Sequence, residues 1–473
     1  MDSDPLANVR AAFDTLDAGR RTLAASTAQD RIARLRRIRS AALAQREALC
    51  AAVGEDLGRP AVETELGEVY MVVSEIDHAI AHLAEWMEPE RVPTPLLLTG
   101  THSEIRYEPK GRILVLAPWN FPFQLVLVPL VAALAAGNCV AVRPSSRAPH
   151  TARFLEGFLA GLFPPEEVAV FQGGHEVADA LLDLPFDHVF FTGSARTGRK
   201  VMVAAARHLA SVTLELGGKS PALVDRSADV AKSAERILWG KCFNAGQSCI
   251  APDYVLVHRD LEEAFLAAGQ RVLEARYGAD ETARGPSPSM GRMIDAEHHA
   301  KVLRLLEDAV AAGARVVAGG TSRPEERYLA PTILAGVRPE MSILQEEIFG
   351  PVLPVLPFGD LDEAIEFVQA RPRPLSLYVF ARDRRAVERV LRHTTVGGTC
   401  VNTTLLHFTH PGLPFGGNGE SGMGSAHGHA GFLEFSHAHA VLVQGRPDGI
   451  RTFYPPYSEK KLGLVRKAIR FLA

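Results

Sequence analysis

The sequence predicts an α/β protein with two lobes, each built on parallel strands. Three observations support this fold class. Short apolar strands alternate with helical segments from Arg112 onward, the alternation resumes after Pro221, and a glycine pair, Gly217 and Gly218, lies between the two series. Such alternation is typical of βαβ units. The 473 residues also exceed what one simple core usually holds, which favours two or three domains.

The composition excludes several classes of protein. Apolar residues make up 47% of the chain and charged residues 22%, as in an ordinary globular protein. A net charge of -4 gives no strong field for nucleic acid or an anionic membrane. The five cysteines form no CxxC pair, which argues against a disulfide framework or a zinc site and for a reducing compartment. Residues 1–10 do not resemble a signal peptide, so we expect a cytoplasmic location.

The first 80 residues are predicted to be helical, because residues 31–53 carry apolar side chains at helical spacing. This pattern ends in residues 85–109, where an extended or hairpin segment is expected. Three prolines and one glycine interrupt that segment: Pro89, Pro93, Pro95 and Gly100.

Two segments raise the question of membrane contact. Residues 125–142 are nearly all apolar, but Pro129, Gly137 and Asn138 interrupt them, so a buried helix leading into a buried strand is expected rather than a membrane span. Residues 458–473 alternate basic and apolar side chains over one short helix. We expect this helix to lie at the surface or at a subunit contact, with a membrane-surface anchor as the alternative.

The remaining elements follow the strand–helix alternation, and the lobes are divided near residues 216–220. In the first lobe the expected strands are 113–116, 140–142, 168–171, 188–191 and 211–214, with a helix over 195–208. In the second lobe the expected helices are 228–243, 261–275, 296–312, 362–370 and 384–393, and the expected strands are 254–257, 352–356, 377–380 and 398–401. A crevice between lobes is a common place for a ligand.

Cys249 is the strongest candidate nucleophile. The helix before it is expected to end at residues 244–246, with Gly246 as its C-cap, so that Cys249 lies on a loop among small and polar residues. A thiol needs a helix end, a base or a cation to become reactive. A structural thiol is the alternative for Cys249, and inert core thiols are expected at Cys242 and Cys400 because their neighbours are apolar.

Two further side chains complete a set for covalent chemistry on a carbonyl. Glu215 lies 34 residues before Cys249 at the end of an apolar strand, where partial burial would suit a general base. A solvated strand-end carboxylate is the alternative. Asn120 lies between Pro118 and Pro122, which fix its backbone as an oxyanion donor requires. A turn-forming asparagine is the alternative there.

Two weaker signals indicate a nucleotide. A glycine-rich turn that includes Gly193, Ser194 and Gly198 follows a strand and opens a helix, which suits pyrophosphate, although it is not the GxGxxG fingerprint. Glu347 offers a carboxylate for ribose hydroxyls, and Phe349 an aromatic face for a ring. No metal site is predicted at the four late histidines, which lack matching acids or cysteines: His427, His429, His437 and His439.

Together these motifs resemble the aldehyde dehydrogenase superfamily, over nearly the whole chain and in the family's order. The matching motifs are Pro118-Trp119-Asn120, Phe191-Thr192-Gly193-Ser194, Leu214 to Pro221, Gly246-Gln247-Ser248-Cys249, Glu347 to Pro351, and Pro414-Phe415-Gly416-Gly417. The resemblance implies an aldehyde dehydrogenase-like fold with a Rossmann-type cofactor lobe, an α/β catalytic lobe and a small β oligomerisation extension. The implied bounds are 1–85 and 109–216 for the cofactor-binding domain, 217–402 for the catalytic domain, and 86–108 and 403–473 for the oligomerisation or bridging segments.

Three features resemble the class 3 branch, which includes fatty, aromatic and coniferyl aldehyde dehydrogenases. The region before the Trp-Asn motif is short, His427-Gly428 is followed by Phe432 and by 435–437, and residues 454–461 read YPPYSEKK. The resemblance implies a homodimer. It also implies medium-chain aliphatic or aromatic aldehydes as substrates. Membrane-bound members carry a hydrophobic C-terminal anchor, which this tail lacks.

The resemblance assigns roles that agree with the chemistry of the residues. Cys249 would be the nucleophile, Asn120 with the Cys249 N–H would form the oxyanion hole, and Glu215 would activate the deacylating water. For the cofactor, Glu347 would bind the nicotinamide ribose and Phe349 would pack near that end of the coenzyme. The turn with Gly193, Ser194 and Gly198 would face the pyrophosphate, and Trp119 of the first motif would complete the set. Tyr70 and Phe121 are candidates for the substrate tunnel, with core packing as the alternative.

One departure from the family bears on the coenzyme. The family usually has Lys-Pro-Ser-Glu where this chain has Arg143-Pro144-Ser145-Ser146. Ser146 removes a negative charge that would repel a 2′-phosphate, and Arg143 with Arg147 could pair with that phosphate. The coenzyme is therefore predicted to be NAD or NADP. We expect the enzyme to accept NADP, and in the stronger form of this prediction it prefers NADP to NAD.

The predicted reaction is oxidation of an aldehyde to a carboxylic acid through a Cys249 thioester that is hydrolysed with Glu215 as base. A coenzyme-A-acylating dehydrogenase is one alternative, against which Glu215 argues. A cysteine esterase or thioesterase is another, and it would not need Glu347 or the turn at Gly193. A catalytically silent scaffold protein is the third, against which the intact Cys249, Glu215 and Asn120 set argues.

Overall fold

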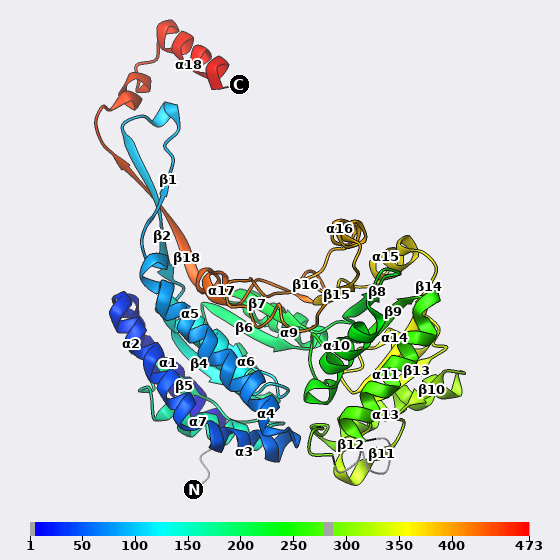
Figure 1. Ribbon diagram of the computed structural model, residues 1–473. Helices are drawn as coiled ribbons and strands as arrows, with labels where there is room; N and C mark the ends of the chain where they lie inside the picture. The colour runs from blue at the N-terminus through cyan, green and yellow to red at the C-terminus, as the bar shows by residue number, and fades with distance from the viewer. Residues whose placement is uncertain (1–4, 279–286, 473) are drawn as a thin grey trace.

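The computed structural model describes residues 5–278 and 287–472, which form two sheet-centred lobes and a projecting arm (Figure 1). The sheet of the first lobe has the strand order β17-β7-β6-β3-β4-β5, and its pairs are parallel except for β17 with β7. Its strands are β3 (Arg112–Leu116), β4 (Cys139–Arg143), β5 (Val168–Val170), β6 (His188–Gly193), β7 (Ser211–Leu216) and β17 (Gly422–Met423). The five strands predicted for this lobe are confirmed.

Helices cover both faces of this sheet, because its strands are apolar on both sides. Along β3, Ile113 and Val115 pack toward one face, and Leu114 and Leu116 toward the other. The first face is covered by α2 (Ala28–Ala44), α3 (Arg46–Leu57), α5 (Met71–Trp86), α6 (Gln124–Ala136) and α7 (Pro149–Ala160). The second is covered by α1 (Pro5–Ala24), α8 (His175–Leu182) and α9 (Ala195–Ala206).

The N-terminal helices differ in detail from the expected pattern. The helical span predicted for 31–53 is interrupted at Gln45, which separates α2 from α3. A one-turn helix, α4 (Ala61–Thr64), continues into a π-helix, η1 (Glu65–Tyr70), before α5 begins. Apolar periodicity does not reveal a π-turn, and such turns are frequent at functional sites.

The apolar segment 125–142 is a buried helix followed by a buried strand, as predicted. Every residue of α6 is buried except Leu125, and α6 ends at Gly137, whose φ of 91° suits glycine. The next residues enter β4, all of whose side chains are buried. Among the described helices, none has the length and apolar character needed to cross a membrane.

The second lobe contains a seven-stranded sheet with the order β10-β13-β14-β9-β8-β15-β16, in which only β10 is antiparallel to its neighbour. Its strands are β8 (Pro221–Val224), β9 (Tyr254–His258), β10 (Arg315–Ala318), β13 (Thr332–Ala335), β14 (Val352–Phe358), β15 (Ser376–Phe380) and β16 (Gly398–Val401). The four predicted strands are confirmed, whereas β8, β10 and β13 were not expected. Each of these three is only four residues long, as is the predicted β16, so the periodicity signal in strands of this length is weak.

The helices expected in this lobe are all present. They are α10 (Val230–Cys242), α11 (Glu262–Tyr277), α13 (Ala296–Ala311), α15 (Leu361–Gln369) and α16 (Arg384–His393). Aspartates at the N-caps of α10, α13, α15 and α16 accept backbone N–H groups, which explains where these helices begin. Two short elements, the hairpin β11 (Ser322–Arg323) with β12 (Tyr328–Leu329) and the helix α14 (Ser342–Gln345), were not expected.

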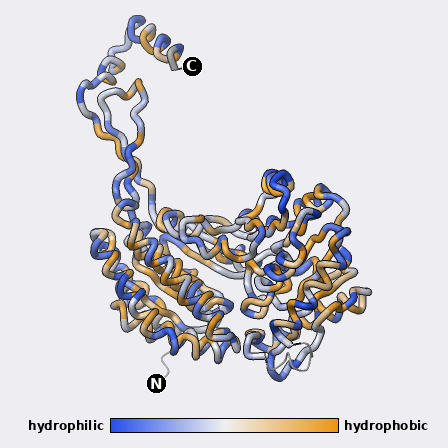
Figure 2. Tube along the Cα trace, viewed as in Figure 1, coloured by the Kyte–Doolittle hydropathy of each residue, from blue (hydrophilic) through white to orange (hydrophobic). Residues whose placement is uncertain are grey.

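The arm projects from the first lobe as a three-stranded antiparallel sheet with the order β1-β2-β18 (Figure 1). Its strands are β1 (Glu90–Val92), β2 (Thr101–Pro109) and β18 (Ser436–Gln444), so the extended segment predicted at 85–109 is confirmed. The helix α17 (Gly428–Glu434) precedes β18 and packs on α5 and α6. The predicted tail helix is α18 (Glu459–Leu472), which lies beyond the arm and alternates hydrophilic and hydrophobic residues (Figure 2).

Candidate active site

Two cavities meet at Cys249, Glu215 and Thr192, which line both of them. The apolar cavity has a volume of about 320 Å³ and is lined mainly by side chains such as Leu66, Tyr70, Met71, Phe121, Phe243 and Phe408. The polar cavity has a volume of about 360 Å³ and is lined by Trp119, Asn120, Arg147, Gly193, Ser194, Lys301, Glu347, Phe349 and others. The site therefore lies where an apolar ligand and a polar ligand can meet over one thiol.

A left-handed turn delivers Cys249 to this junction. The helix α10 ends at Cys242, slightly before the predicted position, and a short turn follows in which Asn244, Ala245 and Gly246 have φ values of 54°, 52° and 74°. A Cβ at Gly246 would collide with the carbonyl of Gly350, so only glycine fits there. Gly246 thus has the positive φ expected of a helix C-cap, and the two residues before it, Asn244 and Ala245, also have positive φ.

The thiol of Cys249 has a microenvironment that keeps it protonated. Burial, followed by the charges of Glu347 and Glu215, raises the pKa of Cys249. A thiol in this state needs a proton acceptor or an added positive charge before it can attack. Cys242 and Cys400 are buried in the core, and burial raises the pKa of Cys242 to about 12, in line with the expectation of inert thiols at these positions.

Glu215 lies at the carboxyl-terminal end of β7, where parallel sheets commonly place functional groups. Its side chain is buried, with 5% exposure for the residue, so it is not the solvated carboxylate considered as the alternative. Neither carboxyl oxygen has a hydrogen-bond partner among the described residues. Burial, and then the charge of Glu434, raise the pKa of Glu215 well above the usual range. An unsatisfied buried carboxyl beside a cavity is suited to bind water and take its proton.

Asn120 lies on the loop that follows β3 and is hydrogen-bonded to the loop that carries Cys249. Its side-chain amide donates to the carbonyl oxygen of Gln247 at 3.2 Å, and its own carbonyl oxygen accepts from the Asn244 amide at 2.8 Å. Asn120 is buried and lines the polar cavity together with Cys249. A fixed amide donor thus lies beside the candidate nucleophile.

The polar cavity has the features that a nicotinamide dinucleotide requires. Gly193 and Ser194 line it at the start of α9, where the Ser194 hydroxyl accepts from the Thr197 N–H and the free N–H groups of the first turn suit pyrophosphate. Glu347 accepts from the Gly218 N–H at 3.1 Å, and burial raises the pKa of Glu347 to about 7. A protonatable carboxyl at the wall suits ribose hydroxyls.

Aromatic rings form one wall of the polar cavity. The ring of Trp119 lies 5.4 Å from that of Phe349 and 5.3 Å from that of His298, measured between centroids. The Arg147 guanidinium lies 5.0 Å from the Trp119 ring and pairs with Asp295 from the second lobe. His298 and Lys301 belong to this wall but were not predicted, because α13 carries no local motif that distinguishes them.

Three residues predicted for the coenzyme do not form the wall of the polar cavity. Arg143 donates to the carbonyl oxygens of Gly173 and Gly174, at 2.6 and 2.9 Å, while the nearby Ser146 is exposed. A Cβ at Gly198 would press on the Leu216 side chain, so this glycine serves close packing of α9 on the sheet.

Tyr70 and Phe121, the two candidates for the substrate tunnel, both line the apolar cavity. Phe121 stacks with Phe243 at 6.2 Å between centroids. Much of the remaining wall comes from segments far apart in the sequence that no local motif identifies, among them Leu66, Gly67, Met71, Trp239, Leu405, Leu406 and Phe408. Phe415 and His427, which belong to sequence features named above, also line this cavity. Within residues 5–278 and 287–472, no three His, Cys, Asp or Glu side chains gather as a metal site.

Comparison with known proteins agrees with this geometry. The model of the aldehyde dehydrogenase family matches residues 3–441. The chain is 43% identical over 422 residues to human aldehyde dehydrogenase family 3 member B1, covering 88% of each chain. It is 41% identical over 441 residues to a probable coniferyl aldehyde dehydrogenase of Pseudomonas aeruginosa, covering 93% of this chain and 92% of the relative.

Solved structures give the same result. A substrate-bound state of Staphylococcus aureus AldH matches with a TM-score of 0.93 at 38% identity, covering 98% of this chain and 99% of the other. A betaine aldehyde dehydrogenase from the same species, in complex with NAD+, matches with a TM-score of 0.82 at 28% identity, covering 92% and 90%. Both lobes thus have the fold of solved aldehyde dehydrogenases, one of which holds NAD+. The chain belongs to the aldehyde dehydrogenase family and oxidises aldehydes to carboxylic acids.

Proposed function

We propose that Cys249, Asn120 and Glu215 carry out this oxidation in sequence. The Cys249 thiol first loses its proton to water in the cavity, which the positive charge of a bound NAD(P)+ would favour. The sulfur then attacks the aldehyde carbon, and the carbonyl oxygen becomes an oxyanion held by the Asn120 amide and the Cys249 N–H. When bound in the polar cavity, NAD(P)+ supplies the hydride acceptor, and a thioester on Cys249 remains. Glu215 then takes a proton from water, whose oxygen attacks the thioester, so that the acid leaves and the sulfur is released.

The observation that carries this proposal is the position of Glu215. It is the unsatisfied carboxyl that lines both cavities next to Cys249, which supports hydrolysis of the thioester over transfer to coenzyme A. A cysteine esterase would have no use for a second, polar cavity over the same thiol. Both alternatives are therefore disfavoured.

The apolar cavity supports medium-chain aliphatic or aromatic aldehydes as substrates. A cavity of about 320 Å³ walled by aromatic and aliphatic side chains, with Tyr70 and Phe121 among them, gains most from burying an apolar chain or ring. The relative named as a probable coniferyl aldehyde dehydrogenase is consistent with an aromatic substrate.

For the coenzyme, we propose that NADP is accepted as well as NAD and is the better of the two. Glu347, Phe349, Trp119, Gly193 and Ser194 would hold the parts common to both, as the wall of the polar cavity suggests. The choice between them would depend on the exposed Ser146 and its neighbours Arg143 and Arg147 near the adenosine end, with Gly198 keeping α9 close to the sheet.

We further propose that the enzyme is a cytoplasmic homodimer. The exposed arm made of β1, β2 and β18, with the tail beyond it, is a suitable dimer element because its strand edge and apolar side chains have no partner in the described chain. In this proposal 1–85 and 109–216 bind the coenzyme, 217–402 form the catalytic domain, and 86–108 with 403–473 form the bridging segments.

The test is formation of reduced coenzyme, followed by its absorbance, with NAD and NADP against hexanal, benzaldehyde, coniferyl aldehyde and succinic semialdehyde. We expect activity with the first three aldehydes and loss of activity in Cys249→Ala with coenzyme binding retained. Activity that survives Cys249→Ala would refute the proposed nucleophile, and activity confined to succinic semialdehyde would refute the proposed substrate class.

A further inference from the structure

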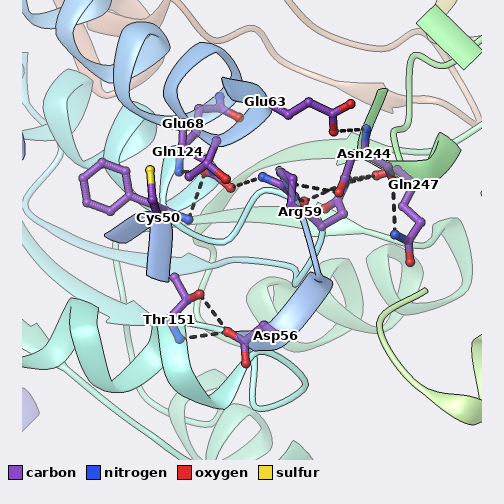
Figure 3. Close-up of polar contacts among 12 residues, drawn as sticks. Cys50, Asp56, Arg59, Glu63, Glu68, Gln124, Thr151, Asn244 and Gln247 are labelled. Carbon is purple, nitrogen blue, oxygen red and sulfur yellow. Dashed lines mark hydrogen bonds and ion pairs between the residues drawn. The ribbon is translucent and has the colours of Figure 1, made fainter. Parts of the chain in front are cut away.

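A fully buried ion pair lies behind the active site. Arg59 Nη1 donates to Glu68 Oε1 at 2.6 Å, and both side chains are completely excluded from solvent (Figure 3). Removing two charges from water is costly, so a pair of this kind persists only where its remaining donors and acceptors are satisfied. The partners of those remaining atoms show what the pair does.

Arg59 binds both loops that form the active site. Its Nε donates to the Asn244 side-chain oxygen at 2.8 Å, and its Nη2 donates to the main-chain carbonyl of Asn120. The guanidinium also lies 4.7 Å from the centre of the Phe121 ring. Because a guanidinium is planar and rigid, these contacts fix the three groups relative to one another.

Glu68 holds the segment that follows Asn120. Its second oxygen accepts from the backbone N–H groups of Phe123 and Gln124 at 3.2 and 2.7 Å, at the start of α6. Burial raises the pKa of Glu68, and the Arg59 charge opposes that effect. Arg59 thus holds the chain at Asn120, and Glu68 holds the same chain at Phe123 and Gln124.

The network continues to the cysteine loop. The Asn244 amide donates to the Asn120 carbonyl at 2.8 Å. It also donates to the Gln247 carbonyl at 3.0 Å (Figure 3). Gln247 is also the acceptor for the Asn120 side-chain amide, at 3.2 Å. Asn244 has a φ of 54°, a conformation that asparagine tolerates and that these bonds hold in place. A continuous chain of hydrogen bonds therefore runs from Glu68 through Arg59 to the residues just before Cys249.

The same N-terminal segment also faces the substrate. Glu68 lies in the π-helix η1, whose neighbouring residues Leu66, Gly67 and Tyr70 line the apolar cavity. The segment therefore presents apolar groups to the substrate and one buried carboxylate to the network. An ion pair that served only to stabilise the packing of these segments would not need to contact the residue that carries the proposed oxyanion donor.

We propose that Arg59 and Glu68 are positioning residues that hold the Asn120 amide where the oxyanion forms. They act on the reaction through Asn120 and touch neither the aldehyde nor the coenzyme. The proposal rests on the role of Asn120 proposed above. Misplacing a catalytic group by about 1 Å can cost about 10²-fold in rate, so the effect of losing the pair is measurable.

The test is a double-mutant cycle between Arg59→Met and Asn120→Ala, read out as the single-turnover rate of coenzyme reduction at saturating aldehyde. We expect Asn120→Ala to slow this step about 10²- to 10³-fold. Arg59→Met should slow it about 10- to 100-fold, with little change in coenzyme affinity. In the Asn120→Ala background, Arg59→Met should change the rate by less than about twofold, because the group it positions is absent.

Arg34→Met is the matched control, since Arg34 pairs with Glu167 at 2.8 Å in the same lobe, away from both cavities. It should lower the melting temperature without slowing the single-turnover step. Arg59→Lys serves the same cycle if Arg59→Met does not fold, because it keeps the charge beside Glu68 but loses the fork that reaches Asn244 and Asn120 together.

The two proposals fail in different ways. If Asn120→Ala leaves the rate unchanged, the proposed oxyanion donor is wrong. If Asn120→Ala slows the reaction but the Arg59 effect is equally large in both backgrounds, Asn120 keeps its role and the positioning role of Arg59 is refuted. An Arg59 variant that loses only thermal stability, as Arg34→Met should, refutes it as well.

Discussion

The side-chain amide of Asn120 donates to the carbonyl oxygen of Gln247, two residues before Cys249, at 3.2 Å. This bond joins the loop after β3 in the first lobe to the loop after α10 in the second. A second bond, from the Asn244 amide to the Asn120 carbonyl oxygen at 2.8 Å, joins the same two loops. These bonds position the candidate oxyanion donor relative to the candidate nucleophile, so any movement between the lobes at this point would change the geometry of the reaction.

The first prediction concerns this donor. Asn120→Ala should lower kcat about 10²- to 10³-fold, the usual cost of losing one oxyanion donor, while the affinity for the coenzyme stays unchanged. Turnover and coenzyme titration by fluorescence check the two halves separately. Loss of coenzyme binding in this variant would instead place Asn120 in the nucleotide site.

The second prediction separates acylation from deacylation. Glu215→Gln should still produce about one equivalent of reduced coenzyme per active site in a rapid burst, because in the proposed mechanism the Cys249 proton passes to water and not to Glu215. The following steady state should be about 10²- to 10⁴-fold slower, the usual range for loss of a general base. Rapid-mixing absorbance measures both phases, and mass spectrometry detects the acyl group on Cys249.

Glu420→Gln is the control for this experiment, since Glu420 is an exposed carboxylate paired with Arg199. It should behave as the wild type. A Glu215→Gln enzyme that shows no burst would contradict the proposed role and would place Glu215 in the activation of the thiol.

The third prediction concerns stability as a function of pH. Burial raises the pKa of Glu347 from its ordinary value of 4.5 to about 7 in the folded protein. Between these two values the folded state binds more protons than the unfolded state, so Glu347 lowers the free energy of unfolding as the pH rises through this window. Glu347→Gln keeps an oxygen for the Gly218 N–H but cannot ionise.

The melting temperature of coenzyme-free Glu347→Gln, relative to the wild type, should therefore increase between pH 5 and pH 8. Scanning fluorimetry across this range measures it. A difference that stays constant with pH would mean that Glu347 titrates near its ordinary value and that its burial is relieved in solution.

Local patterns predicted the parts of the site that each depend on one short stretch of chain. Cys249 and Asn120 each follow a helix or a strand by a few residues, and Glu215 lies at the end of a strand, so their position at an edge of the fold could be inferred from the sequence. The same holds for Gly193 and Ser194 at the start of α9. All five line the polar cavity, and Cys249 and Glu215 line the apolar cavity as well.

What the sequence could not predict depends on contacts between distant segments. Arg59 lies in the loop between α3 and α4, and Glu68 lies in η1, both more than 50 residues before Asn120. Nothing near them in the sequence distinguishes a buried network from a surface ion pair. The placement of Gly198 against Leu216 was missed for a similar reason, since glycine in a helix permits either a ligand or a close neighbour. In both cases the role of the residue depends on side chains that are distant in the sequence and become neighbours only in the folded protein.

The fourth prediction concerns the choice of coenzyme. Ser146→Glu should lower the ratio of kcat/KM for NADP to kcat/KM for NAD at least about tenfold, because a carboxylate there repels a 2′-phosphate and competes for Arg143. Steady-state kinetics with both coenzymes measures the ratio. Ser146→Ala, which adds no charge, should leave it within about twofold. An unchanged ratio in Ser146→Glu would show that the 2′-position lies elsewhere.

The fifth prediction concerns the arm. Leu442 and Val443 are 54% and 52% exposed on β18, which is an edge strand of the arm sheet. Adjacent residues of a strand point to opposite faces, so the pair exposes apolar surface on both sides of that edge. If the arm joins two subunits, the double variant Leu442→Asp, Val443→Asp should convert the dimer into a monomer of 51.2 kDa, as measured by light scattering after size exclusion.

Leu209→Asp is the control for this experiment. It alters a side chain that is 94% exposed on the body of the first lobe and should leave the mass unchanged. A wild-type monomer, or a double variant that stays dimeric, would show that this edge does not hold subunits together.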